Sequence, residues 1–185
     1  MGQQSLPQLQ MDRDDLEHLP EVQIAEGYRL RIYQRGDEAA WCRLMGECIG
    51  GHYDEAECRS SLTETPNFAP EDMFFAEYDG EIVGSACAHR GADTPEGVGY
   101  VHMVAVTPAH RGHRLGHTVT NAVLWRFREL GYGAATLRTD DFRLPAIRIY
   151  LELGFHPTMT HESHAARWEA VLEELSSGPR AHPSS

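Results

Sequence analysis

Several features that often reveal a protein's class are missing from this chain. No apolar run approaches the roughly 20 residues that a membrane-spanning helix needs. The first ten residues are Gln-rich and uncharged, so they lack the basic region and apolar core of a secretory signal peptide. The four cysteines, at positions 42, 48, 58 and 87, include no Cys-x-x-Cys pair, which argues against a disulfide framework and a thiolate zinc site. These absences favour a cytoplasmic protein without a membrane segment.

Positive charge is also scarce. The formal net charge is −12 at pH 7, and Asp and Glu are spread over most of the chain. Such a surface repels phosphate backbones and argues against nucleic acid as a partner. It mildly favours a cationic or amine substrate through electrostatic steering, although solubility alone is the simpler explanation.

The length of 185 residues, of which 41% are hydrophobic, suits one domain with a sizeable core. We expect an N-terminal extension over 1–26, which carries two prolines and an acidic cluster, a single domain over 27–175, and a disordered tail over 176–185. Whether the protein is a monomer or a homodimer is left open by the sequence.

Between these ends, the predicted strands and helices alternate. Period-2 patterns predict strands, and 3.6-period patterns predict helices. Asp79-Gly80 between two strands is a strong hairpin signal, and the strand–helix–strand order over 98–139 predicts one parallel pair. The result is an α/β protein with a mixed sheet. Strands are expected at 28–32, 73–78, 81–89, 98–106, 134–139 and 155–159, and helices after 37, near 55–62, and over 116–130, 144–153 and 168–175.

The most informative segment is Val104-Ala-Val-Thr-Pro-Ala-His-Arg-Gly-His-Arg-Leu-Gly-His-Thr-Val119. A β-branched strand ends before Pro108, a basic turn follows, and an amphipathic helix begins near Gly116. The free backbone N–H groups and positive dipole of such a helix start form an anion cradle. A pyrophosphate group is the ligand that such a site suits best.

Two other interpretations of this segment are less favourable. His110, His113 and His117 could be metal ligands, but no carboxylate or Cys completes the set, so we expect no metal. The loop also lacks the Gly-Lys-Ser/Thr of nucleoside triphosphatases and the Gly-x-Gly-x-x-Gly of dinucleotide-binding folds.

This segment, together with Ala146-Ile-Arg-Ile-Tyr-Leu-Glu-Leu-Gly-Phe155, resembles two motifs of the GCN5-related N-acetyltransferase (GNAT) superfamily. The resemblance covers about residues 28–159. It implies a mostly antiparallel mixed sheet flanked by helices, splayed between its fourth and fifth strands (98–106 and 134–139). It also implies direct transfer of acetyl from acetyl-CoA to a primary amine, with a small molecule preferred as acceptor over a protein N-terminus or lysine. The alternative is a non-catalytic acyl-CoA-binding module that acts as a sensor or regulator.

The resemblance also assigns the donor site. The pantetheine arm is expected beside the backbone of Val104, Ala105 and Val106. The pyrophosphate is expected on the N–H groups of the following turn, with a charge-assisted contact from the Arg111 side chain. The turn residues concerned are Arg111, Gly112, His113, Arg114, Leu115, Gly116 and His117. Two residues depart from the family pattern, because Arg114 stands in place of a usual Gly and Arg143 in place of a frequent Asn.

Two catalytic residues follow from the same comparison. Tyr150 matches the tyrosine that protonates the departing CoA sulfur in many members, and its alternative role is packing in a buried helix face. His102 is the candidate base, and its parity along the strand predicts that it shares a face with Val104 and Val106. Its alternative role is that of a hydrogen-bonded strand histidine. Weaker base candidates are Glu77 and Tyr100. Tyr53, Phe68 and Phe74 are expected to line the acceptor pocket, and segment 50–72 is expected to carry the variation in acceptor binding.

Overall fold

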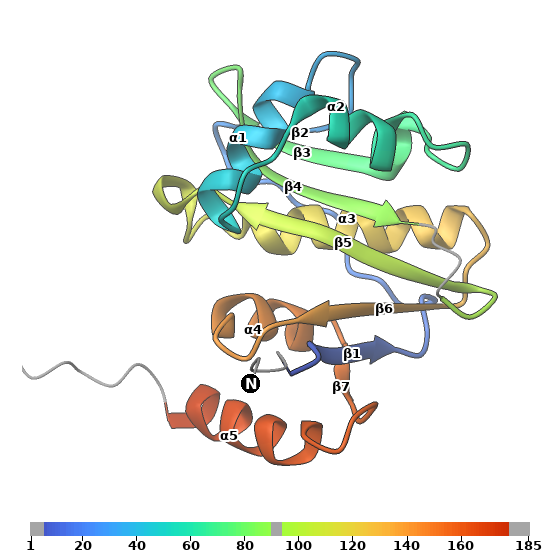
Figure 1. Ribbon diagram of the computed structural model, residues 1–185, viewed down its shortest axis with the longest axis vertical. Coiled ribbons are helices and arrows are strands. Elements are labelled where there is room, and N and C mark those ends of the chain that lie inside the picture. Colours follow the sequence, from blue (N-terminus) through green and yellow to red (C-terminus); the bar gives the residue numbers. More distant parts are fainter. Residues whose placement is uncertain (1–5, 90–93, 178–185) are drawn as a thin grey trace, which may run out of the picture.

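A mixed sheet organises the part of the chain that the computed structural model describes, residues 6–89 and 94–177 (Figure 1). Its strands are Leu9–Arg13 (β1), Tyr28–Ile32 (β2), Met73–Tyr78 (β3), Glu81–His89 (β4), Val98–Val106 (β5), Ala134–Thr139 (β6) and His156–Thr158 (β7). The helices are Glu38–Cys48 (α1), Glu55–Cys58 (α2), Leu115–Glu129 (α3), Leu144–Glu152 (α4) and His164–Ser177 (α5). The strand order is β2-β3-β4-β5-β6-β1-β7.

Most neighbouring strands are antiparallel. β3 and β4 form the predicted hairpin, in which Asp79 and Gly80 have φ values of +48° and +82°. Both turn residues therefore lie in the left-handed region that two-residue hairpins favour. β5 and β6 are parallel and are joined through α3. The predicted mixed, mostly antiparallel α/β fold is confirmed.

The strands β5 and β6 separate part-way along their length. Their ladder consists of the pairs from Val98–Ala134 to Tyr100–Thr136, although β5 continues to Val106. Figure 1 shows the two strands diverging from this point, with α4 at the open end. The predicted splay between these strands is confirmed, and we call the space between them the notch.

Two hydrophobic cores cover the two faces of the sheet. The α3-side core contains Val119, Val123 and Phe127 of α3, and the α1-side core contains Trp41 and Met45 of α1. These residues recur at helical spacing because each helix buries one stripe against the strands. A Cβ on the β5 residue Gly99 would lie 2.4 Å from the Phe127 ring, so glycine here allows α3 to pack closely.

A β-bulge interrupts β5 at Met103. Met103 has a φ of +52°, and the pairing of β4 with β5 shifts between Ser85 and Cys87. The Ser85 hydroxyl donates a hydrogen bond to the Met103 carbonyl at 3.1 Å. Because a bulge inserts one extra residue, the alternation of faces changes at this point. Val101 and Val104 therefore both contact the α3-side core, while Met103 and Ala105 contact the α1-side core.

The N-terminal segment differs from the expected extension. Residues 9–13 form β1, which lies between β6 and β7 and buries Leu9 and Met11 completely. The following segment is held to α3, because Thr118, Asn121 and Trp125 donate side-chain hydrogen bonds to the carbonyls of residues 20–23. The expected boundary at residue 27 therefore does not separate an extension from the sheet.

At the other end, α5 runs through Ser177, so residues 176 and 177 of the expected tail are helical and 178–185 lie outside the described residues. Among the described residues, the structure has no helix that is long and apolar enough to cross a membrane.

Candidate active site

The predicted anion cradle forms at the start of α3. A 3₁₀ turn, Pro108–His110, follows β5, and Gly112 and Arg114 have φ values of +86° and +57°. The first bond of the helix runs from the Thr118 N–H to the Arg114 carbonyl at 3.0 Å. The N–H groups of Leu115, Gly116 and His117 therefore point out of the helix start without an acceptor inside it.

One member of the predicted N–H set is already engaged. The Arg111 N–H donates to the Pro108 carbonyl at 3.3 Å. The backbone donors of the cradle therefore run from Gly112 to His117. Arg111 can contribute through its side chain, which is exposed.

Helix α4 lies against the cradle. A Cβ on Gly116 would meet the Ile149 side chain at 3.0 Å, so the absence of a side chain at 116 lets the two helices approach. Arg114 takes the left-handed conformation at the position where the family usually has glycine, and its side chain forms an exposed ion pair with Glu152 at 3.7 Å.

Two arginines lie around the end of α1 that faces the cradle. Burial and the charge of Glu47 raise the pKa of the Cys48 thiol, whereas the positive charges of Arg111 and Arg143 oppose this shift. Both guanidinium groups therefore lie within electrostatic range of one thiol, although they are 32 positions apart in the chain. Arg111 belongs to the cradle turn itself, whereas Arg143 forms an ion pair with Asp140 at 3.0 Å.

The predicted pantetheine segment borders the notch. Ala105 is buried, and Val104 and Val106 are half-buried. On one side this stretch pairs with β4, through Ser85–Ala105 and Gly84–Val106. On the other side the ladder with β6 has already ended at Tyr100. The backbone edge of this stretch can therefore pair with an extended ligand, as a strand would.

Tyr150 is only 6% exposed and belongs to the α3-side core, with its ring 6.0 Å from that of Phe155. Burial raises the pKa of its phenol, while the charge of Arg143 opposes the shift and Tyr100 adds to it. Tyr100 is the last β5 residue that pairs with β6. Tyr150 is therefore within electrostatic range of the point where the strands part, and its phenol holds its proton across the physiological pH range.

His102 lies on the opposite face from the one its parity predicts. It pairs with Cys87, a member of the α1-side core, whereas Val104 and Val106 contact the α3-side core. The bulge at Met103 is the physical reason, because the extra residue reverses the alternation after His102. The prediction of a shared face was therefore wrong.

His102 belongs to a group of three aromatic rings. Its ring centroid lies 5.5 Å from that of Tyr100 and 5.4 Å from that of His89. Burial, followed by the charge of His89, lowers the pKa of His102 from 6.5 to about 4. His102 is therefore neutral at pH 7, the state a proton acceptor needs, and the same shift makes it a weaker base than an exposed histidine. Sequence analysis missed His89, because the cross-strand register that brings it beside His102 has no local signal.

Glu77, another base candidate, lies outside the group of rings around His102. Its carboxylate bonds the side chains of Arg29 and Arg31, both at 2.7 Å, and these bonds lower its pKa. It belongs to an ion-pair network between β2 and β3 and does not join the group around Tyr100.

A cavity of about 360 Å³ lies among α1, the loop that follows it, α2 and the bulge of β5; we call it the α1–α2 cavity. Tyr53, which the sequence predicts in the acceptor pocket, is one of its lining residues. Phe68 and Phe74 instead contact the α1-side and α3-side cores, respectively. The complete lining is Trp41, Gly50, Gly51, His52, Tyr53, Asp54, Glu57, Cys58 and Met103.

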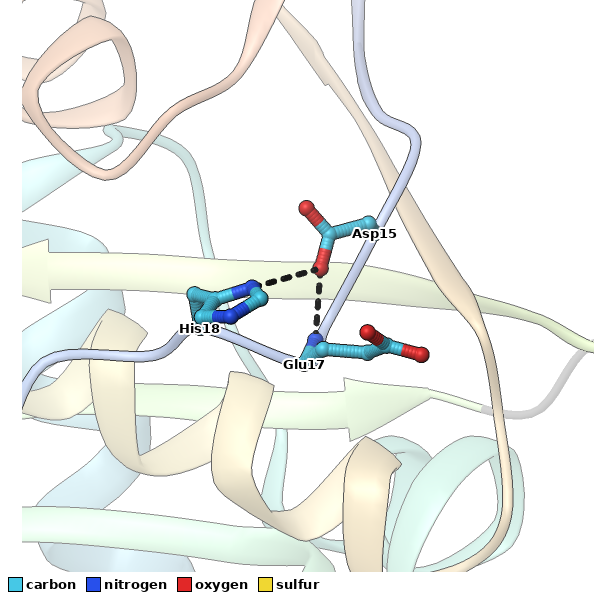
Figure 2. Close-up of side chains that lie close together, drawn as sticks. All are labelled: Asp15, Glu17 and His18. Carbon is cyan, nitrogen blue, oxygen red and sulfur yellow. Dashed lines mark hydrogen bonds and ion pairs between the residues drawn. The ribbon is translucent and has the colours of Figure 1, made fainter.

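The histidines of the cradle do not gather into a metal site. His110 Nδ1 forms a 2.9 Å hydrogen bond with the Tyr28 hydroxyl. Within the described ranges, the one group of side chains close enough to hold a metal ion is Asp15, Glu17 and His18, shown in Figure 2. These side chains are exposed, and Asp15 already accepts the Glu17 backbone N–H at 2.6 Å.

Comparison with known proteins decides the family. The model of the acetyltransferase (GNAT) family matches residues 33–155, which include the cradle, the notch and Tyr150. The chain belongs to the GNAT family.

Curated relatives carry the name mycothiol acetyltransferase. The protein of Thermomonospora curvata is 34% identical over 143 residues, 74% of this chain and 47% of its own length. That of Thermobispora bispora is 34% identical over 147 residues, 74% of this chain and 49% of its own. The chain thus spans about half the length of the curated relatives it matches.

Solved structures support the fold. A GCN5-related N-acetyltransferase from Sphaerobacter thermophilus has a TM-score of 0.69 at 24% identity, over 83% of this chain and 50% of that one. A GNAT-family acetyltransferase from Colwellia psychrerythraea has a TM-score of 0.65 at 13% identity, over 83% and 53%.

Proposed function

We propose that this protein transfers an acetyl group from acetyl-CoA to a primary amine of a small molecule. The observation that carries the proposal is the notch between β5 and β6, which joins the anion cradle at one end to Tyr150 and Tyr100 at the other. A cradle alone would suit many anions. A cradle continuous with an open strand edge and a buried phenol suits a long thioester that ends in a phosphate group.

The donor would bind through backbone groups. The pyrophosphate would accept hydrogen bonds from the N–H groups of Gly112 to His117, and Arg111 would add a charge-assisted contact. The pantetheine arm would lie along Val104–Val106. Arg114 does not prevent this arrangement, because it already has the left-handed backbone conformation and keeps its N–H.

The chemistry needs two proton transfers. The amine nitrogen must lose a proton to attack the thioester carbon, and the departing CoA sulfur must gain one. His102, neutral at pH 7, would accept the first proton, directly or through water. Tyr150 would donate the second, because its phenol is protonated at neutral pH; burial raises its pKa and makes it a weaker acid, so the transfer requires the thiolate to form beside it.

The choice of a small-molecule acceptor rests on two observations. The relatives' name, mycothiol acetyltransferase, refers to a compound and not to a protein substrate. The α1–α2 cavity, at about 360 Å³, also falls within the range of small-molecule sites.

The four cysteines are free in the structure, which supports a cytoplasmic location.

The decisive experiment is a free-thiol release assay with acetyl-CoA and a panel of amines. Tyr150→Phe should lower kcat about 100-fold while the Kd for CoA changes less than about twofold. Tyr132→Phe is the matched control, because Tyr132 packs on Phe127 in the α3-side core and should not affect kcat. An unchanged kcat in Tyr150→Phe would limit that residue to packing. CoA binding without thiol release from any amine would favour the non-catalytic module.

The cradle has its own test by calorimetry. Arg111→Glu should weaken CoA binding about tenfold or more, because it replaces an attraction to the pyrophosphate with a repulsion. Arg35→Glu makes the same charge change in the exposed turn before α1 and should leave the Kd within about twofold. Equal effects of the two variants would mean that only the net charge of the protein matters.

A further inference from the structure

The turn between β6 and α4 carries an aromatic side chain that stands in solvent. Phe142 is 76% exposed, the largest value among the large hydrophobic side chains that the structure describes, and it belongs to neither of the two hydrophobic cores. An aromatic side chain stabilises a fold mainly through the apolar area that it buries. Packing therefore does not account for an aromatic residue at this position.

The turn is held in place, so it presents the ring in a fixed position. The Arg143 N–H donates to the Asp140 carbonyl at 3.0 Å and closes the turn. The carboxylate of Asp141 accepts a hydrogen bond from the Arg167 side chain of α5 at 2.8 Å. The Arg143 guanidinium lies over the Phe142 ring, 5.4 Å from its centroid. One face of the ring is therefore next to a positive charge, and the opposite face is left to a ligand.

This turn lies across the notch from the cradle. Because β5 and β6 are parallel, the turns that follow them lie at the same end of the sheet (Figure 1). The cradle follows β5 and Phe142 follows β6, so they stand on opposite sides of the open end of the notch. Arg111 and Arg143, one from each side, are both within electrostatic range of the Cys48 thiol. A ligand with its pyrophosphate on the cradle can therefore extend toward Phe142.

The other side of the cradle suits an anionic ligand less well. Tyr78 is exposed there, but its ring already packs on that of His110, with centroids 5.1 Å apart. Exposed Asp79 and Glu81 follow it closely in the chain and would repel a phosphate. The positive charge of Arg143 has the opposite effect beside Phe142. Charge therefore favours the side of the notch on which Phe142 lies.

We propose that the adenine ring of the donor stacks on the open face of Phe142, and that the positive charge of Arg143 attracts the phosphate on its ribose. This inference rests on the proposed function, because it takes CoA as the ligand of the cradle. Beyond its pyrophosphate, CoA carries an adenosine whose ribose is phosphorylated. A base stacks on the face of an aromatic side chain, and a guanidinium attracts a phosphate.

Two ligands isolate the contribution of the adenosine. Phosphopantetheine has the same arm as CoA and one phosphate, but no adenosine. In Phe142→Ala, calorimetry should show CoA binding about fivefold or more weaker, as expected for the loss of one stacked base, while the Kd for phosphopantetheine changes less than about twofold. Equal losses for the two ligands, or no loss with either, would overturn the inference.

Two further variants separate stacking from apolar contact. Phe142→Trp keeps an aromatic face, so the Kd for CoA should stay within about twofold of the parent value. Phe142→Leu keeps an apolar side chain without a planar face, so it should lose most of the affinity that alanine loses. Circular dichroism checks that the variants fold. If leucine binds CoA as tightly as phenylalanine, or tryptophan as weakly as alanine, the base does not stack on this residue.

Tyr78→Ala is the matched control on the other side of the cradle. It also removes an exposed aromatic ring, and it should leave the ratio of the Kd values for phosphopantetheine and CoA unchanged. A lower ratio in Tyr78→Ala, together with an unchanged ratio in Phe142→Ala, would place the adenine beside Tyr78 and overturn the inference.

Arg143→Gln tests the charge, with dephospho-CoA, which lacks the phosphate on the ribose, as the second ligand. The variant should bind CoA about threefold or more weakly than the parent does, through loss of a partly exposed charge interaction, and dephospho-CoA with a Kd within about twofold. Arg148→Gln removes the same charge from an exposed position of α4 and should weaken neither ligand. Equal effects of Arg143→Gln on the two ligands would remove Arg143 from the proposed contact.

The failure of this inference is distinct from the failure of the proposed function. Thiol release by a protein whose CoA affinity does not depend on Phe142 refutes adenine stacking and supports acetyl transfer. CoA binding that depends on Phe142, without thiol release from any amine, supports the inference and refutes acetyl transfer to those amines. An absence of CoA binding would overturn both.

Discussion

Replacing Arg114 with glycine tests whether the cradle stores backbone strain. Arg114 begins α3 with a φ of +57°, and a residue with a Cβ in this region costs roughly 1–2 kcal/mol. Glycine avoids this cost but loses roughly 0.5–1 kcal/mol through its greater freedom in the unfolded chain. The ion pair with Glu152 is exposed, with 68% and 46% of the two side chains accessible, and contributes about 0.3 kcal/mol.

The balance is a net gain of about 0.5 kcal/mol for Arg114→Gly, or a rise in Tm of about 1–2 °C for a chain of this size. Arg114→Ala removes the same ion pair and keeps the Cβ, so it should lose about 0.3 kcal/mol. Glycine should therefore be more stable than alanine at position 114 by about 0.8 kcal/mol. Urea unfolding followed by circular dichroism measures this difference.

The sign of the stability difference between glycine and alanine shows whether the backbone at position 114 is left-handed. Arg128 is exposed in α3, where ordinary helical backbone makes glycine less stable than alanine by about 1 kcal/mol. The glycine-minus-alanine difference should thus be positive at 114 and negative at 128. A negative value at both positions would refute the left-handed conformation of Arg114.

Two further predictions concern packing in the sheet, and a third concerns pH. Gly99→Ala should destabilise the protein by about 3 kcal/mol in urea unfolding, because its Cβ would meet the Phe127 ring at 2.4 Å, whereas Gly133→Ala, with open space around it, should be close to neutral. Met11→Ala should cost about 3 kcal/mol if β1 is part of the sheet, and a change below about 1 kcal/mol would make the segment an extension after all.

The third prediction concerns pH. The pKa of His102 is lowered from 6.5 to about 4, so below pH 6.5 the unfolded chain binds a proton that the folded chain does not, and folding stability falls as the pH drops toward 4. The full effect corresponds to about 3 kcal/mol. His102→Gln should remove this part of the pH dependence of the unfolding free energy, measured by urea unfolding. If that free energy changes equally with pH in the two proteins, the lowered pKa of His102 is refuted.

The cradle could be predicted because its signals are local. A strand ending before Pro108, a basic turn with Gly112 and a helix after it are enough to place free N–H groups at one point. The notch was inferred from the family resemblance, since where two strands stop pairing is decided by their packing and not by their composition.

The face of His102 could not be predicted, because the bulge at Met103 has no local signal. A positive φ usually selects glycine or asparagine, and methionine at such a position looks like an ordinary strand residue. The bulge is fixed instead by pairing with β4, where Ser85 bonds the Met103 carbonyl. One inserted residue was enough to make a parity argument wrong.

The strand β1 was missed for a different reason. Leu9 and Met11 alternate with polar residues, but the pattern covers only five residues and follows a proline. Its partners, β6 and β7, lie near the opposite end of the chain. Short strands whose partners are distant carry little local information, so tertiary pairing decides their structure.

The position of β1 also sets the order in which the sheet can be completed. The strands β2 to β5 follow one another and can pair as they leave the ribosome, whereas β1 pairs with Ala135–Thr139 on one side and with His156–Thr158 on the other. The side chains of Leu9 and Met11 therefore cannot be buried in the sheet until nearly the whole described chain has been synthesised. Because contacts that close such long loops form slowly, β1 enters the sheet after strands that follow it in the chain, and β7, which pairs with β1 at the edge, joins no earlier.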